Sequence, residues 1–476
     1  MICTPKVRHF WRCIFFVFNL QFYPSIFVCV LGHTKRRGDD MKSVWIETAK
    51  RPQFEPLRGE IKTDVLIVGG GMTGILCAYM LKQAGVDCVL IEASHICSGI
   101  TKNTTAKITL QHGLIYDQMI RRFGEERARL YLKTQRDAMQ QYRVLSQAHP
   151  CDYEELPSYV YSQKDPQKLL REVAALERLG CRATYCDRIA LPISVAGGVR
   201  VDAQAQFHPL KFAFSIARDL PVYENTKLLE LRADGAITEH GRIVSRAVIL
   251  ATHFPIFNRH GSYFLKLYQH RSYVTALESA PNFEGMYVDE AERGLSFRNY
   301  NGLLLLGGGG HRTGKQGGTW NELEQVRQLY FPRSKEICRW ATQDCMTLDG
   351  IPYIGQYSAR TPNLYVATGY NKWGMTSSMV AAMLLTEMIC GRHPDAAEIF
   401  SPSRSILRPQ LAINAAESLI GLLTPTAPRC PHLGCALKYN AQEHSWDCPC
   451  HGSRFSEDGE LIDNPATGDK KSLRRK

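Results

Sequence analysis

A strand–turn–helix–strand pattern near the start of the chain constrains its fold more than any other feature. Residues 64–68 form a short apolar run, a glycine-rich turn follows at residues 69–74, and residues 75–84 have helical spacing. A second apolar run, residues 87–91, ends in Glu92. This is the βαβ pattern of dinucleotide-binding domains, so we expect a Rossmann-type α/β fold here.

The turn supplies the first candidate cofactor-binding residues. Gly69 permits the tight turn, Gly71 lets the backbone approach a pyrophosphate, and Gly74 lets the helix pack on the strand. Glu92 can accept hydrogen bonds from ribose hydroxyls, and its charge argues against the 2′-phosphate of NADP. The complete turn is Gly69, Gly70, Gly71, Met72, Thr73 and Gly74.

A second pattern lies close to the C-terminus, where Cys430-x-His432 is followed by Cys448-x-x-His451. Two thiolates and two imidazoles are the ligands of a Rieske [2Fe-2S] centre, in which one iron binds sulfurs and the other binds histidine nitrogens. Zinc uses the same residue types, but Cys-x-His is an unusual spacing for zinc ribbons. The pattern therefore favours a metal site that handles electrons singly.

Residues 430–435 and 448–453, with their glycines and Ser453, resemble Rieske proteins of the respiratory type. The resemblance implies that the two cysteines of the half-motifs ligate one iron and that the two histidines ligate the other. It also implies a disulfide between Cys435 and Cys450. Phe455 stands where high-potential relatives have tyrosine, so we expect a lower reduction potential.

The expected Rieske domain, residues 428–476, is short. It follows a helix and linker at residues 403–427, and few strands precede its first ligand loop. We expect the rest of the chain, or a partner chain, to cover it.

The glycine turn alone does not separate FAD from NAD, and a later segment decides between them. Residues 364–369 form a strand that enters a glycine turn, and residues 371–376 open a second helix. With residues 248–252 and 349–355, this segment resembles D-amino-acid-oxidase-like, glycine-oxidase-type flavoproteins. The resemblance implies FAD, with further binding residues Ala93, Gly99, Thr104, Thr105, Ala106, Gly369, Trp373, Gly374, Met375 and Thr376.

The same resemblance divides residues 41–402 into two interleaved parts. The FAD part takes residues 60–115, 195–253 and 335–402. The substrate part takes residues 116–194 and 254–334, which we expect to form an antiparallel sheet over the reactive ring.

No catalytic base is evident from the sequence of the substrate part. His311 and Arg312 follow a run of glycines and are candidates to face the substrate, and Lys107 is a candidate to lie near the flavin. An arginine there would bind a carboxylate bidentately.

Composition excludes some classes of function. The chain is 44% hydrophobic and 22% charged, which is ordinary for a globular protein. Its net charge of +12 is dispersed and accompanies no nucleic-acid motif, so no nucleic-acid partner is expected. Residues 1–40 have the outline of a membrane anchor, but Met41 reads smoothly into the first domain. We expect translation from Met41 and a cytoplasmic protein, or an anchored one if residues 1–40 are translated.

Together the two patterns predict an FAD-dependent dehydrogenase for a small amine, amino acid or related substrate. Electrons would leave through the Rieske cluster to a redox protein or a quinone. Two alternatives remain open: electron flow in the reverse direction, from a reductase, and a non-catalytic carrier or sensor. The chain lacks the Asp-x-x-His-x4-His segment of Rieske oxygenases.

Overall fold

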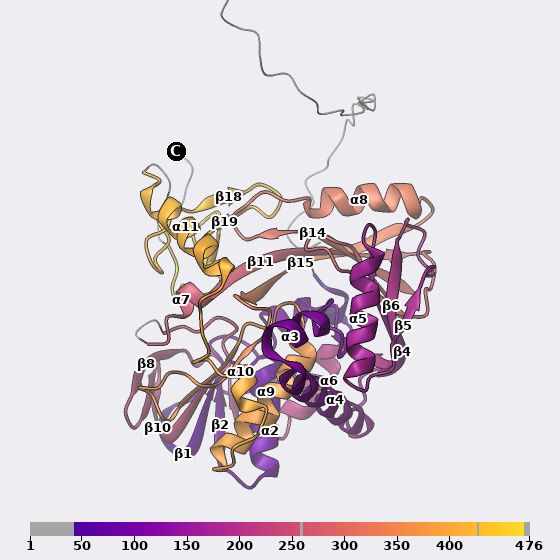
Figure 1. Ribbon diagram of the computed structural model, residues 1–476. Coiled ribbons are helices and arrows are strands. Elements are labelled where there is room, and N and C mark those ends of the chain that lie inside the picture. Colours follow the sequence, from indigo (N-terminus) through magenta and orange to yellow (C-terminus); the bar gives the residue numbers. More distant parts are fainter. Residues whose placement is uncertain (1–41, 258–259, 426–427, 471–476) are drawn as a thin grey trace, which may run out of the picture. The chain divides into compact units, whose positions relative to one another are not determined.

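The computed structural model describes residues 42–257, 260–425 and 428–470, all within one compact unit, Asp40–Lys476 (Figure 1). The expected leader, residues 1–40, lies outside the described residues. The described residues form two large sheets, one small sheet and surrounding helices, which confirms the expected α/β fold with a mostly β C-terminal module. None of the helices described is both long and apolar enough to cross a bilayer.

The first sheet carries the predicted dinucleotide-binding pattern. Its central strand β1 runs parallel to β2 and β10, and β10 runs parallel to β17. The last four residues of β1 are buried, as expected for a parallel strand covered on both faces. The path of the sheet is β16 (Tyr353–Gln356), β17 (Leu364–Thr368), β10 (Gly241–Leu250), β1 (Gly59–Val68), β2 (Cys88–Ile91) and β7 (Val222–Tyr223), with β9 (Gly235–Thr238) and β8 (Leu228–Arg232) beside β10.

Two helices with buried apolar residues follow the glycine turns of this sheet. Helix α2 (Met72–Gln83) begins at the first turn and packs against α9 (Gly374–Ile389), which begins at the second. Helix α4 (Glu125–Ala148) also packs on α9. Both predicted helix starts are therefore present.

The second sheet is antiparallel except where β12 pairs with β4. Its path is β15 (Lys335–Thr347), β11 (Leu267–Glu278), β14 (Leu303–Arg312), β13 (Ser296–Tyr300), β12 (Met286–Asp289), β4 (Glu154–Ser162), β6 (Gly197–Gln206) and β3 (Lys107–Ile108), with β5 (Thr184–Cys186) beside β6. Helix α8 (Thr319–Tyr330) packs on β14, and α5 (Pro166–Arg178) packs on β6 (Figure 1).

The expected boundaries between the FAD and substrate parts differ from the structure at three strands. β3, β6 and β15 lie in the second sheet, whereas residues 60–115, 195–253 and 335–402 were expected in the FAD part. The reason is pairing: β15 pairs with β11 along nearly its whole length, β6 pairs with β4, and β3 pairs with β6. In the chain, β6 is followed by α6, and β15 is followed by β16 of the first sheet.

The third sheet is small and belongs to the C-terminal module. Its strands have three residues each and follow the order β18 (Lys438–Asn440), β19 (Ser445–Asp447), β20 (Arg454–Ser456) and β21 (Leu461–Asp463). Helix α11 (Pro409–Leu423) precedes it. The remaining helices are α1 (Val44–Glu47), η2 (Ile100–Asn103), α3 (Tyr116–Phe123), α6 (Pro209–Ala217), α7 (Tyr263–Lys266) and α10 (Ala397–Phe400).

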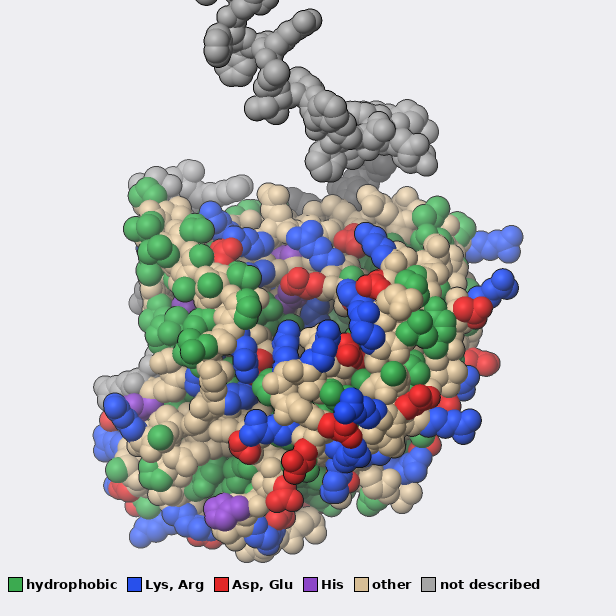
Figure 2. All heavy atoms as spheres, viewed as in Figure 1, with side chains coloured by type: hydrophobic (Ala, Val, Ile, Leu, Met, Phe, Trp, Pro, Cys, Tyr) green, Lys and Arg blue, Asp and Glu red, His purple; other side chains and the backbone are tan. Residues whose placement is uncertain are grey.

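The outer face of α11 is apolar. Leu419, Ile420, Leu422 and Leu423 are 49–72% exposed. Figure 2 shows hydrophobic side chains gathered over this helix. A patch of this kind is typical of an interaction surface.

Candidate active site and cluster site

A cavity of about 800 Å³ receives residues from all three sheets or their loops. Its wall includes the turn after β1, residues of β11 and β15, and the start of α9. Residues of the 461–467 segment, in the C-terminal module, form another part of the wall. The volume lies in the range of small-molecule and cofactor sites.

Most of the predicted cofactor-binding residues line this cavity: Gly69, Gly71, Met72, Thr73, Glu92, Ala93, Gly99, Thr104, Thr105, Trp373, Gly374 and Met375. The others are outside its lining: Gly70, Gly74, Ala106, Gly369 and Thr376. Thr101 is not among the individually predicted binding residues; its Oγ1 accepts a hydrogen bond from Met72 N at 3.1 Å at the start of α2. It also did not identify Thr252 and His253, which follow β10 and line the cavity.

The glycine turn is packed so tightly that two positions exclude a side chain. Gly69 has φ +108°, and a Cβ there would lie 2.6 Å from the oxygen of Ala251. A Cβ on Gly74 would lie 2.0 Å from the oxygen of Gly69. The carboxylate of Glu92 accepts a hydrogen bond from Gly70 N at 2.7 Å and so braces the turn. This cradle fits the pyrophosphate of a dinucleotide at the N-terminus of α2.

The start of α9 has an unusual backbone. Asn371 and Lys372 have φ of 51° and 74°, values that non-glycine residues rarely adopt. Lys372 and Trp373 reach the cavity, and Thr376 instead exchanges two hydrogen bonds with the backbone of Thr109. The strain is stored next to the cavity, as is common at functional sites.

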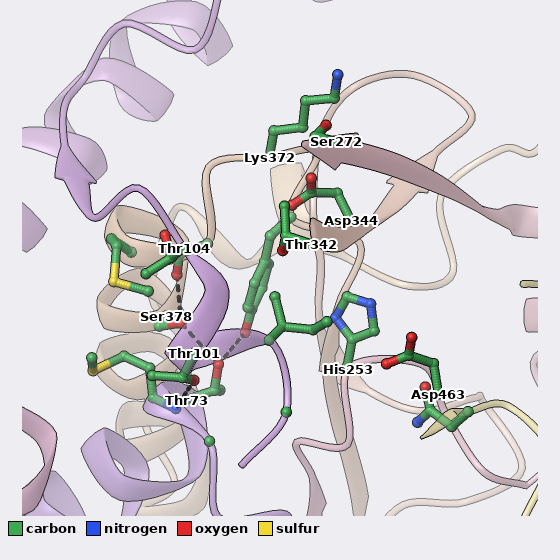
Figure 3. Close-up of a pocket in the computed structure, with 18 of the residues that line it drawn as sticks. Thr73, Thr101, Thr104, His253, Ser272, Thr342, Asp344, Lys372, Ser378 and Asp463 are labelled. Carbon is green, nitrogen blue, oxygen red and sulfur yellow. Dashed lines mark hydrogen bonds between the residues drawn. The ribbon is translucent and has the colours of Figure 1, made fainter. Parts of the chain in front are cut away.

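A polar group of residues lies at the far end of the cavity (Figure 3). Thr342, Asp344 and Met346 are alternate residues of β15 and therefore share one face of that strand. Ser272 joins them from the neighbouring strand β11. The sequence analysis did not single out these residues, because residues 338–347 show no clear alternation of apolar and polar side chains.

Of the three predicted candidates for the chemistry, Lys107 lines the cavity. Its Nζ donates a hydrogen bond to Thr105 Oγ1 at 3.1 Å. Burial, with the nearby charge of Arg298, lowers the pKa of Lys107 to about 7. The role of Lys107 near the flavin stays a prediction.

His311 and Arg312 are outside the cavity lining within the described chain. The Arg312 guanidinium donates to the carbonyl oxygens of Pro449 at 3.1 Å and Cys450 at 3.4 Å, in the second ligand loop of the C-terminal module. His311 Nε2 lies 2.9 Å from Tyr273 Oη. We therefore propose that Arg312 positions the iron–sulfur module instead of binding substrate.

The four predicted metal ligands come together in the C-terminal module. The ring centroids of His432 and His451 are 4.9 Å apart. Both ring nitrogens of His451 are buried and have no hydrogen-bond partner in the part of the chain described. Hydrogen bonds from neighbouring thiols, Cys430 first among them, lower the pKa of Cys448. Two buried cysteines of one hydrophobic cluster and two adjacent imidazoles are the donor set of a Rieske [2Fe-2S] centre, so the residues present fit one.

The two loops that carry the predicted ligands, residues 430–435 and 448–453, are each closed by a backbone hydrogen bond between their first and last residues. Cys430 N donates to Cys435 O at 2.8 Å, and Cys448 N donates to Ser453 O at 2.9 Å. The sulfurs of Cys435 and Cys450 lie within 4.8 Å of each other, and both residues are free thiols in the structure. The disulfide between them stays a prediction.

The rest of the same chain covers the short iron–sulfur module. A Cβ on Gly421 of α11 would lie 2.6 Å from Cys450 Sγ, and a Cβ on Gly452 would lie 2.1 Å from the side chain of Gln269 on β11. The missing cover expected from the sequence is therefore supplied by α11 and the second sheet.

A buried ion-pair network holds this module against β11. Glu443 pairs with Arg271 of β11 and, at 2.8 Å, with Arg454 of β20. Tyr273 Oη donates to the same carboxylate at 2.9 Å. Burial alone would raise the pKa of Glu443, but the two guanidinium groups lower it to about 2.

Replacing Glu443 with glutamine should therefore destabilise the protein. The change leaves two buried arginines short of a negative charge, and we expect the free energy of unfolding to fall by about 3 kcal/mol at pH 7. Chemical denaturation measures this value, with the exposed Glu460→Gln as the matched control.

The difference in the free energy of unfolding between wild type and Glu443→Gln should depend on pH. Since the pKa of Glu443 is lowered from 4.5 to about 2 on folding, its stabilising effect is complete above the unfolded value and is lost as the pH falls between the two. The difference between wild type and Glu443→Gln should shrink over that acidic range. A difference that stays constant from pH 7 to pH 3 would contradict the charge-pairing explanation.

Comparison with protein families gives two matches. The family of FAD dependent oxidoreductases (DAO) matches residues 64–388, and the Rieske [2Fe-2S] domain matches residues 408–474. The second match includes α11. The first match implies FAD as a cofactor, and the second implies a [2Fe-2S] cluster.

Individual relatives extend these matches. The chain is 34% identical over 488 residues to a Bacillus subtilis (strain 168) protein named Rieske 2Fe-2S iron-sulfur protein YhfW, covering 89% of this chain and 96% of the relative. It is 26% identical over 384 residues to gamma-glutamylputrescine oxidoreductase of Escherichia coli (strain K12), covering 72% and 87%. Glycine oxidase from Geobacillus kaustophilus has a similar fold, with a TM-score of 0.61 at 18% identity, covering 72% and 99%.

Proposed function

Because the chain belongs to the DAO family of FAD-dependent oxidoreductases and carries a Rieske domain, we propose that it is a dehydrogenase of small amines or amino acids. In this proposal electrons leave through the cluster to a redox protein or quinone. The division of the chain into FAD, substrate and iron–sulfur parts belongs to the same proposal, with β3, β6 and β15 assigned to the substrate sheet.

One observation carries the proposal: the predicted nucleotide turn and the iron–sulfur module line the same cavity. Gly69 and Gly71 lie in one part of its wall, and Asp463 and Asn464 lie in another. A bound FAD would supply a hydride acceptor for the substrate carbon, and a bound Rieske centre would supply a one-electron acceptor. A shared cavity supports direct transfer between the two.

The wall between the cavity and the predicted cluster ligands is thin. His253 lines the cavity, and the next residue, Phe254, has its ring centroid 6.2 Å from that of His432. Asn464 donates a hydrogen bond to Phe254 O at 3.1 Å and so fixes this contact from the iron–sulfur side.

A second contact leads toward the other predicted histidine ligand. His253 Nε2 lies 3.1 Å from Gln269 Oε1, and the Gln269 side chain packs against Gly452, the neighbour of His451. Both predicted histidine ligands are thus connected to the cavity wall through few residues. This arrangement supports the cluster as the exit for electrons.

The name of one relative supports amines as the substrate class. The E. coli relative is named as an oxidoreductase of gamma-glutamylputrescine, an amine. The polar end of the cavity, around Ser272 and Asp344, would hold and orient the substrate (Figure 3). Amine oxidation by flavoproteins does not require a dedicated side-chain base, and we assign none.

Anaerobic mixing with a panel of amines and amino acids tests the function. The flavin absorbance should bleach with a correct substrate, and the paramagnetic signal of a reduced Rieske cluster should follow. A flavin that bleaches while the cluster stays oxidised for minutes contradicts the proposed exit. Cluster-to-flavin transfer after reduction of the cluster alone would favour the reverse direction of flow.

A further inference from the structure

The polar end of the cavity contains one carboxylate whose surroundings differ from those of the others. Asp344 projects from β15, beside Thr342 on the same strand face and near Ser272 of β11 (Figure 3). No hydrogen bond or close ion pair of its side chain occurs with any described residue; Lys372 and Arg271 act on it through longer-range charge.

Two of the other acidic residues in this part of the cavity have partners, and a third faces solvent. Asp289 accepts from Gln163 Nε2 at 2.7 Å, and Glu290 pairs with Lys168 at 3.2 Å. The side chain of Glu292 is 70% exposed.

The acidic residues in the remaining wall of the cavity, Glu92 and Asp463, also have partners. Glu92 accepts backbone hydrogen bonds from Gly70 and Ser94, and Asp463 pairs with Arg454 at 3.0 Å. Among the described lining residues, Asp344 is therefore the carboxylate without a close partner, apart from the solvent-exposed Glu292.

The basic side chains of the cavity do not pair closely with Asp344. Within the described chain no arginine lines it, so a bidentate clamp for a substrate carboxylate is missing. The Lys372 ammonium points away from Asp344 in Figure 3 and lies 3.4 Å from Glu292 O. The polar end therefore offers an anion without an adjacent cation.

We propose that Asp344 binds the ammonium group of the substrate, and that the substrate is an alkyl amine without a carboxylate next to the nitrogen. This inference rests on the proposed function and narrows its substrate class. The charge and the distance of Asp344 from competing partners leave it free to form a charge-assisted hydrogen bond. Burial raises the pKa of Asp344 to about 6, against the lowering effect of Lys372 and Arg271, so the group is mainly ionised near pH 8.

Binding of unreactive probes tests the inference without turnover. The probes are tert-butylammonium, tert-butanol and pivalate, which share one shape and differ in charge; tert-butylamine has no hydrogen on the carbon beside nitrogen and resists oxidation. Calorimetric titration of the FAD-loaded protein at pH 8 should show binding of tert-butylammonium in preference to the other two.

Asp344→Asn should weaken the binding of tert-butylammonium by about 30-fold, the range seen when one partner of a buried charge pair is truncated. Asp344→Glu should restore part of the affinity. The exposed Asp187→Asn is the matched control and should bind like wild type. FAD content and the cluster spectrum of each variant establish that it is folded.

Three outcomes would overturn the inference: wild-type protein that prefers pivalate, wild-type protein that binds no tert-butylammonium, or Asp344→Asn that binds it as tightly as wild type. These outcomes are separate from failure of the proposed function. Ammonium binding through Asp344 without any electron transfer from amines would contradict the dehydrogenase alone. Equal flavin reduction by amines in wild type and Asp344→Asn would contradict the role of Asp344 alone.

Discussion

His451→Ala protein should contain FAD but almost no [2Fe-2S] cluster. The His451 ring is buried in the iron–sulfur module, and both of its nitrogens lack a hydrogen-bond partner among the residues described. Removing the ring removes one of the two predicted nitrogen ligands of an iron, and the neighbouring His432 is already assigned as the other. Iron and acid-labile sulfide per chain, together with the paramagnetic spectrum after mild reduction, measure the loss.

The matched control for this variant is His444→Ala in the same module. The side chain of His444 is 67% exposed and lies away from the ligand loops, near Glu457. Its replacement should leave iron, sulfide and the spectrum at wild-type levels. A His451→Ala protein with a full and unchanged Rieske spectrum would show that the ligand assignment is wrong.

Gly71→Ala should fold normally and bind FAD at least about tenfold more weakly than wild type, because an added methyl group overpacks the cofactor site. A Cβ on Gly71 meets only Thr101 Oγ1, at 3.5 Å, which is ordinary contact. The protein itself therefore accommodates the methyl group, and the obstruction would fall on a bound pyrophosphate. Fluorescence titration of the stripped protein with FAD gives the affinity.

Gly74→Ala provides the contrasting case. Its Cβ would lie 2.0 Å from Gly69 O, so this variant should lose stability whether or not FAD is present. Gly71→Ala should instead match the denaturation midpoint of the stripped wild-type protein. FAD affinity equal to wild type in Gly71→Ala would place the pyrophosphate elsewhere.

The parts of the site that depend on local pattern could be predicted from the sequence. The strand, turn and helix around Gly69 and Gly74 form one continuous segment whose packing is decided within about thirty residues. The loops of Cys430 and Cys448 likewise carry their ligands at fixed short spacing. Their residue types and spacing therefore predict chemistry before the remainder of the fold is known.

Residues whose surroundings depend on distant strand pairing could not be placed in the same way. Asp344 reaches the cavity because β15 pairs with β11 in a particular register, and a shift of one residue would turn it to the other face. Arg312 seemed suited to a substrate carboxylate because an arginine beside a glycine run has no evident partner in the sequence. Its partners, the carbonyl groups of Pro449 and Cys450, lie more than a hundred positions later in the chain.

The most direct test of the account is the rate of cluster reduction after anaerobic mixing with a substrate amine, followed by rapid-freeze paramagnetic resonance at several protein concentrations. The cavity shared by the FAD residues and the iron–sulfur module predicts that the cluster is reduced at a rate independent of protein concentration. Cluster reduction that slows in proportion to dilution, or that requires a second protein, would contradict transfer within one chain.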